Sequence, residues 1–119
     1  MELRIGLLIL DNYKNVVLLE TEDSLTVPNT SLNNFERLNE ALLRMSSSLG
    51  VEVKDIEFLK AYEQIGKEHS IYLGYLGHAV EKPENLRSML PMEALENNLS
   101  MVAREMIEEF VTKHNLDFI

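Results

Sequence analysis

Two glutamates and one arginine near the middle of the chain have the types and spacing that could bind a metal ion or a phosphate. Glu36 and Glu40 are four residues apart, and Arg44 follows after another four. In a helix the two carboxylates would lie on one face and could share a divalent cation, and Arg44 could bind a phosphate. The simpler interpretation is an exposed acidic face near a helix N-terminus, where acidic side chains are favoured. We prefer it, and keep the three residues as weak candidates.

The residues after Arg44 are poor ligands for a hard cation. Ser46-Ser47-Ser48 carries no charge, whereas Mg²⁺ sites in proteins rely on carboxylates and substrate phosphates. We therefore expect no metal ion at these serines. They also suggest no nucleophile, because no histidine lies near them in the sequence. His78 lies in an apolar run, where we expect it to be packed or hydrogen-bonded.

The elements that would hold these residues follow from hydrophobic periodicity. Residues 2–20 alternate and contain turn residues in the middle, which predicts a β-hairpin. Residues 35–49 have helical spacing, with Asn33 or Asn34 as the N-cap and Gly50 as a left-handed C-cap. The apolar stripe of this helix consists of Leu38, Ala41, Leu42, Met45 and Leu49.

The second half of the chain predicts two strands. We expect strands over 51–62 and 70–80, with a polar loop over 63–69 between them. The strand over 70–80 is apolar on both faces, so both faces should be covered.

The remaining residues predict a loop and a helical C-terminal part. Residues 82–87 form the loop, 90–95 a short helical turn with Pro91 at its first position, and 98–114 a long helix. Strands combined with one long helix from each half of the chain indicate a three-layer α/β arrangement.

Composition narrows the class of protein. A chain of 119 residues favours one domain, over 1–119. The net charge of −9 disfavours a nucleic-acid partner, no apolar run is long enough to cross a membrane, and there is no cysteine. The N-terminus lacks the pattern of a signal peptide. We expect a cytoplasmic protein.

The segment 28–51 resembles the box of the Nudix (MutT-like) family, G-x(5)-E-x(7)-R-E-U-x-E-E-x-G-U, where U is a bulky aliphatic residue. The positions that match the family pattern are Pro28, Glu36, Ala41, Arg44, Gly50 and Val51. The resemblance extends to the order of elements over nearly the whole chain. It implies an α/β (α+β) fold, namely a Nudix-like α/β/α sandwich with a mixed sheet between the box helix and the C-terminal helix.

The differences from the box fall on its chemistry. Family members use the glutamates of the R-E-U-x-E-E run to hold Mg²⁺ or Mn²⁺, and here Arg44 is followed by Met45-Ser46-Ser47-Ser48. Asn29-Thr30 replaces two loop glycines, and the closing glycine arrives one residue early. The resemblance also implies that Arg44 has lost the glutamate partner of a structural ion pair. Glu63 and Glu68 lie in or beside a loop that supplies a further carboxylate in some members.

A second segment fits part of the same pattern. Glu96 and Arg104 have the correct separation, and Glu105, Glu108 and Glu109 follow. The family box is followed by strands, and only a few residues remain after this segment. We therefore expect a solvated helix face.

Three hypotheses about function remain. The first is a Nudix-fold protein with a degenerate box that lacks the usual Mg-dependent hydrolysis, needs no cofactor, and binds a nucleotide-like ligand or acts as an interaction module. The second is a divergent active hydrolase of nucleoside diphosphates linked to another moiety, which would use Mg²⁺ or Mn²⁺ held by Glu36, Glu40 and Glu63 or Glu68. The third is a structural homodimer or complex subunit.

Overall fold

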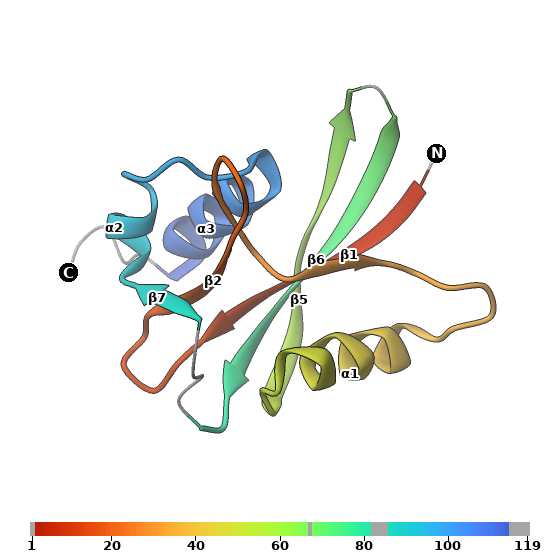
Figure 1. Ribbon diagram of the computed structural model, residues 1–119, viewed down its shortest axis with the longest axis horizontal. Coiled ribbons are helices and arrows are strands. Elements are labelled where there is room, and N and C mark those ends of the chain that lie inside the picture. Colours follow the sequence, from red (N-terminus) through yellow and green to blue (C-terminus); the bar gives the residue numbers. More distant parts are fainter. Residues whose placement is uncertain (1, 67, 82–85, 115–119) are drawn as a thin grey trace.

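The structure, a computed structural model, describes residues 2–66, 68–81 and 86–114. Over these residues it contains a seven-stranded sheet with the order β3-β2-β1-β6-β5, while β4 pairs with β1 and β7 with β2 (Figure 1). The strands are β1 (Glu2–Leu10), β2 (Val16–Glu20), β3 (Leu25–Thr26), β4 (Asn29–Ser31), β5 (Val53–Ile65), β6 (His69–Ala79) and β7 (Arg87–Met89).

Strand β1 is central to this sheet. It pairs antiparallel with β2, with Ile9 opposite Val17, so the predicted hairpin over 2–20 is confirmed. It pairs in parallel with β6 from Glu2 to Leu10, which makes the sheet mixed. Every residue from Ile5 to Leu10 is buried. A strand that is apolar on both sides needs cover on both sides.

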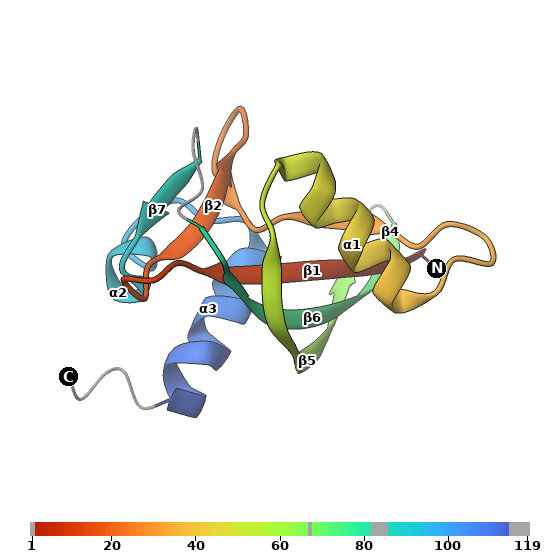
Figure 2. The same ribbon diagram turned by 90° about the horizontal axis from the view of Figure 1, so that it is seen from below.

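The two long helices provide that cover. Helix α1 (Leu38–Leu49) packs on one face and α3 (Met101–His114) on the other, with the short helix α2 (Pro91–Ala94) beside α3. Figure 2 shows α1 and α3 on opposite sides of the sheet. The predicted α/β/α sandwich is confirmed, as is the helical turn that begins at Pro91.

Each helix buries one apolar face in its own core. On the α1 side, Ala41, Leu42 and Met45 pack against the odd-numbered residues of β1, such as Ile5 and Leu7. On the α3 side, the apolar face of the helix packs against even-numbered residues of β1 and β6. The buried residues of that face are Val102, Ala103, Met106, Ile107, Phe110 and Val111.

The start of α1 differs from the prediction. The helix begins at Leu38, with Arg37 in an extended conformation at the N-cap and no side-chain cap, so the predicted start at 35 and the cap at Asn33 or Asn34 are wrong. Phe35 has a left-handed backbone (φ 64°) and a fully exposed side chain. A helix cannot pass through that conformation. The other end is as predicted, since Gly50 (φ 70°) closes the helix.

Two other predicted segments also have different boundaries in the structure. The predicted loop over 63–69 is shorter, because Glu63 to Ile65 continue β5 by pairing with Ile71 to His69. Helix α3 begins at Met101 rather than 98, because Asn98 and Ser100 form backbone hydrogen bonds with Leu25.

The predicted loop over 82–87 lies mostly outside the described residues. Its last residue, Arg87, begins β7. Separately, within the described ranges no helix is long and apolar enough to cross a membrane.

Close contact between α3 and the sheet depends on Gly74 of β6. A Cβ atom there would lie 3.2 Å from Met106 Cε of α3, and also 3.0 Å from the Lys60 carbonyl oxygen and 2.9 Å from Tyr62 Cε2. We expect Gly74→Ala to lower the free energy of unfolding by about 1–3 kcal/mol, because overpacking outweighs the gain of up to about 1 kcal/mol from a stiffer unfolded chain. Urea unfolding tests this. Gly66→Ala is the control, since a Cβ there meets nothing within 4 Å; equal stability of the two variants would contradict the expectation.

Candidate functional site

The guanidinium group of Arg44 binds both carboxylate oxygens of Glu36. Arg44 Nε donates to Glu36 Oε2 at 2.9 Å, and Arg44 Nη2 donates to Oε1 at 2.9 Å. The sequence-based expectation that Arg44 has lost its glutamate partner is therefore wrong. The partner lies eight residues before it, in the loop that precedes α1, and not in the helix.

The same arginine connects this loop to strand β4. Arg44 Nη1 donates to Thr30 Oγ1 at 3.1 Å, and Nη2 donates to the Ser31 carbonyl oxygen at 3.0 Å. The Arg44 hydrogen bond, followed by the Asn33 backbone N–H, lowers the pKa of Glu36 from 4.5 to about 2. The Glu36 carboxylate in turn raises the pKa of Arg44. These contacts hold the loop against the helix.

The arrangement separates the two glutamates that were expected to share one helical face. Glu36 precedes α1, whereas Glu40 lies exposed in its first turn. The side chain of Glu36 is only 12% exposed, and both of its oxygens accept hydrogen bonds. Little capacity remains on Glu36 for a cation.

The serines of α1 bond to their own helix. Ser46 is buried and its hydroxyl donates to the Leu43 carbonyl oxygen at 3.1 Å; the Ser48 hydroxyl donates to the Met45 carbonyl oxygen at 2.9 Å. This bonding to the preceding turn is common for serine in helices. Ser47 lies on the exposed side.

The remaining acidic candidates lie elsewhere. Glu63 is near the end of β5, where His69 Nε2 is 3.0 Å from its carboxylate, and Glu68 is in the adjoining turn. Figure 1 shows this end of the β5–β6 hairpin pointing away from α1. Among residues 2–66, 68–81 and 86–114, no three His, Asp or Glu side chains come together to hold a metal ion.

The acidic residues of α3 lie on the side of the helix that faces away from the core. Glu105 and Glu108 are exposed, and Glu109 lies 3.8 Å from the ammonium group of Lys60. The opposite side of this helix, including Met106, is buried. The resemblance of this segment to the family box is therefore not accompanied by a binding geometry.

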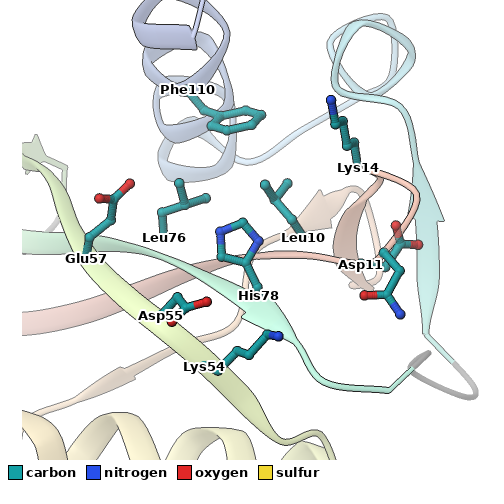
Figure 3. Close-up of a pocket in the computed structure, with 10 residues that line it drawn as sticks. Leu10, Asp11, Lys14, Lys54, Asp55, Glu57, Leu76, His78 and Phe110 are labelled. Atoms are coloured by element: carbon teal, nitrogen blue, oxygen red, sulfur yellow. The ribbon is translucent and has the colours of Figure 1, made fainter.

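A pocket of about 620 Å³ opens on the α3 side of the sheet. Its apolar wall contains Leu10, Leu76 and Phe110, and Figure 3 shows Phe110 facing the two leucines across the pocket. The polar residues come from the β1–β2 turn and from the β5 and β6 ends. They are Asp11, Asn12, Lys14, Lys54, Asp55, Glu57 and His78.

One of these carboxylates already has partners. Asp11 accepts hydrogen bonds from the backbone N–H groups of Tyr13 and Asn15, at 2.8 and 2.9 Å, and from the Asn15 side chain. Asp11 therefore shapes the β1–β2 turn. Lys14, which lies in this turn, lines the pocket.

Two pocket residues have an unusual backbone conformation. Lys14 (φ 65°) and Asp55 (φ 52°) are left-handed; among the described non-glycine residues only Phe35 shares this property. Such conformations persist where the surrounding structure imposes them, and they gather at functional sites. Of these residues the sequence singled out only His78, which was expected to be packed or hydrogen-bonded. The one available signal was the break in strand alternation at Lys54-Asp55.

Comparison with solved structures identifies the fold. A MutT Nudix hydrolase from Burkholderia pseudomallei is 19% identical, with a TM-score of 0.75 over 91% of this chain and 96% of that chain. The Nudix domain of Shewanella oneidensis NrtR, complexed with ADP-ribose, is 13% identical, with a TM-score of 0.79 over 95% and 88%. A MutT/Nudix family protein from Listeria innocua is 14% identical, with a TM-score of 0.75 over 98% and 96%.

The chain therefore has the Nudix hydrolase fold. No family model matches the sequence, and no curated protein matches it either.

The Glu36–Arg44 pair predicts how stability depends on pH. Because folding lowers the pKa of Glu36, its stabilising contribution is complete above about pH 4.5 and is lost as the pH falls toward 2. We expect Glu36→Gln to unfold more easily than wild type at pH 7 and to lose less stability between pH 4.5 and 2. Urea unfolding across this range measures both effects.

The control for this prediction is Glu40→Gln, which removes an exposed carboxylate of α1. Arg44→Lys should also destabilise the protein, because an ammonium group cannot form the two-point contact. Parallel pH profiles for wild type and Glu36→Gln would contradict the assigned role of the pair.

Proposed function

We propose that this protein binds a nucleotide-like small molecule and has lost the metal-dependent hydrolysis typical of Nudix enzymes. The observation that carries the proposal is the lack of any carboxylate on α1 between Arg44 and Gly50, combined with the engagement of Glu36 by Arg44. In the family pattern that part of the helix carries the metal-binding glutamates.

The charge at this site argues against Mg²⁺. A Mg²⁺ ion keeps its octahedral shell through carboxylates, waters and substrate phosphates. Ser46 and Ser48 offer neutral hydroxyls that already donate to backbone carbonyl oxygens, and Glu36 is neutralised by a guanidinium group. The residues present therefore do not fit the metal centre of a Nudix enzyme.

The pocket on the α3 side suits a nucleotide-like ligand. Leu10, Leu76 and Phe110 can pack against a flat base, and Lys14 and Lys54 can pair with phosphate groups. Among the proteins that share the fold, the NrtR domain was solved with ADP-ribose. ADP-ribose is therefore a suitable first probe.

The alternative of a divergent hydrolase has less support. It needs Glu36, Glu40 and Glu63 or Glu68 to converge on Mg²⁺ or Mn²⁺. Glu36 is paired with Arg44. Glu63 and Glu68 lie at the end of the β5–β6 hairpin, which points away from α1 in Figure 1. Its chemistry would be attack of water on one phosphorus of the diphosphate, with release of two monophosphates.

The first test combines binding with turnover. We expect ADP-ribose to bind with the same Kd in Mg²⁺ and in EDTA, as measured by calorimetry, and to remain intact during prolonged incubation with Mg²⁺ or Mn²⁺. Lys54→Ala should weaken binding about tenfold, the loss expected for one charge-assisted hydrogen bond.

The matched control is Lys113→Ala, at an exposed lysine of α3 that does not line the pocket. Two monophosphate products appearing only with the divalent ion would overturn the loss of hydrolysis. Unchanged binding by Lys54→Ala would overturn the placement of the ligand.

A second candidate function, self-association, is favoured by one surface. Helix α1 packs on β1 and β4 and leaves an apolar face on β5 and β6 partly uncovered. Phe58 is 52% exposed, and its ring contacts that of Tyr75 with centroids 5.5 Å apart. The apolar residues along this face, by strand register, are Leu3, Ile56, Phe58, Ile65, Ile71, Leu73 and Tyr75.

A second copy of the chain is the partner that this face fits best. Two molecules with a net charge of −9 repel each other, so self-contact requires a face with little charge. Glu63 is a charged residue on this face of β5, and its carboxylate is paired with His69. Exposed apolar patches beyond a few hundred Å² mark interaction sites.

Light scattering tests the homodimer. We expect wild type to have twice the monomer mass at micromolar concentration and Phe58→Gln to be monomeric, because the polar side chain would be buried without a partner. Leu90→Gln is the control, at an exposed leucine before α2. A monomeric wild type would remove this candidate.

A further inference from the structure

The irregular start of β5 directs an acidic residue into the pocket. Lys54 pairs with His78 and Glu57 pairs with Leu76, so Asp55 and Ile56 together stand opposite the single residue Gly77. This two-against-one arrangement is a β-bulge, a feature that re-aims side chains and occurs beside active sites. The extra residue is what allows Lys54, Asp55 and Glu57 all to line the pocket.

Gly77 accommodates the bulge from the opposite strand. A Cβ atom at Gly77 would lie 2.4 Å from Val53 Cγ1 and 3.3 Å from Ile56 Cγ1. Both side chains therefore occupy the space above the glycine, on the face of the sheet that α1 covers. Asp55 is left to the pocket side, where it appears in Figure 3 next to His78.

The conformation of Asp55 restricts which residues can stand there. Its φ of 52° is left-handed, a region that most residues avoid and that Gly, Asn and Asp tolerate best. The bulge thus provides a position where a short acidic side chain is allowed. Asp55 is exposed, as are Lys14, Lys54 and Glu57, so these groups are accessible to a ligand.

The pocket contains groups suited to each part of a ribonucleotide. Lys14 and Lys54 are donors suited to phosphate, and the apolar wall suits a base. The ionised carboxylate of Asp55 only accepts hydrogen bonds, and a ribose offers two adjacent hydroxyl donors. A carboxylate that binds ribose hydroxyls is a recurring device in nucleotide recognition.

We propose that Asp55 is a specificity-determining residue that selects ribonucleotides over deoxyribonucleotides by accepting a hydrogen bond from the ribose 2′-hydroxyl. This inference rests on the proposed function, because it assumes that the pocket binds a nucleotide. It adds the sugar preference and the residue that produces it.

The test compares ADP with 2′-deoxy-ADP by calorimetry. We expect wild type to bind ADP about tenfold more tightly, the effect of one hydrogen bond to a charged group. Asp55→Gly, which retains the left-handed backbone without strain, should bind the two ligands equally. Asp55→Asn, which also tolerates this backbone, should show an intermediate preference because its amide oxygen is neutral.

The outcomes separate the two claims. Equal binding of both nucleotides by wild type, or an unchanged preference in Asp55→Gly, would overturn the role of Asp55 alone. A preference abolished by Glu57→Gln but not by Asp55→Gly would reassign the role to Glu57 and overturn the inference. Binding of neither nucleotide by wild type would overturn the proposed function as well.

Discussion

The two-point contact between Arg44 and Glu36 determines the geometry around the start of α1. It joins the helix to the loop before it, and Arg44 adds hydrogen bonds to Thr30 and Ser31 of β4. The loop, the strand and the helix are thereby held together by one guanidinium group. The same contact occupies the carboxylate of Glu36, which the divergent-hydrolase hypothesis would need as a metal ligand.

The sandwich itself does not depend on charged groups of α1. It is stabilised by two apolar cores on opposite faces of the sheet, and α1 contributes only apolar side chains to its core. Ser46 is buried where α1 approaches the sheet, with its hydroxyl bonded to the Leu43 carbonyl oxygen. The pocket lies on the other face, between the sheet and α3. No residue of α1 lines this pocket.

Much of the fold could be predicted because it depends on apolar periodicity. The β1–β2 hairpin, the buried face of α3 and the glycine that ends α1 all follow from local patterns. The start of α1 could not be predicted, because it depends on the left-handed backbone of Phe35 and on a contact between Glu36 and Arg44. The spacing of residue types along the chain does not specify which side chains form a contact.

The pocket was missed for a related reason. Its residues come from the β1–β2 turn, from the ends of β5 and β6 and from α3, which the sheet topology brings together. Asp55 reaches it through a bulge that leaves only a broken alternation in the sequence. The comparison structures identify the fold. The chemistry of this chain has to be inferred from its own residues.

The most direct test of the account uses Mn²⁺ as a paramagnetic probe. Amide NMR signals are recorded for the protein with saturating ADP-ribose, before and after addition of Mn²⁺. Because α1 offers hydroxyls where a metal centre needs carboxylates, we expect signals of residues 30–50 to keep their intensity relative to the rest of the chain. Selective broadening of residues 36–48 that depends on the ligand would contradict the central claim, since it would place a divalent ion against the helix.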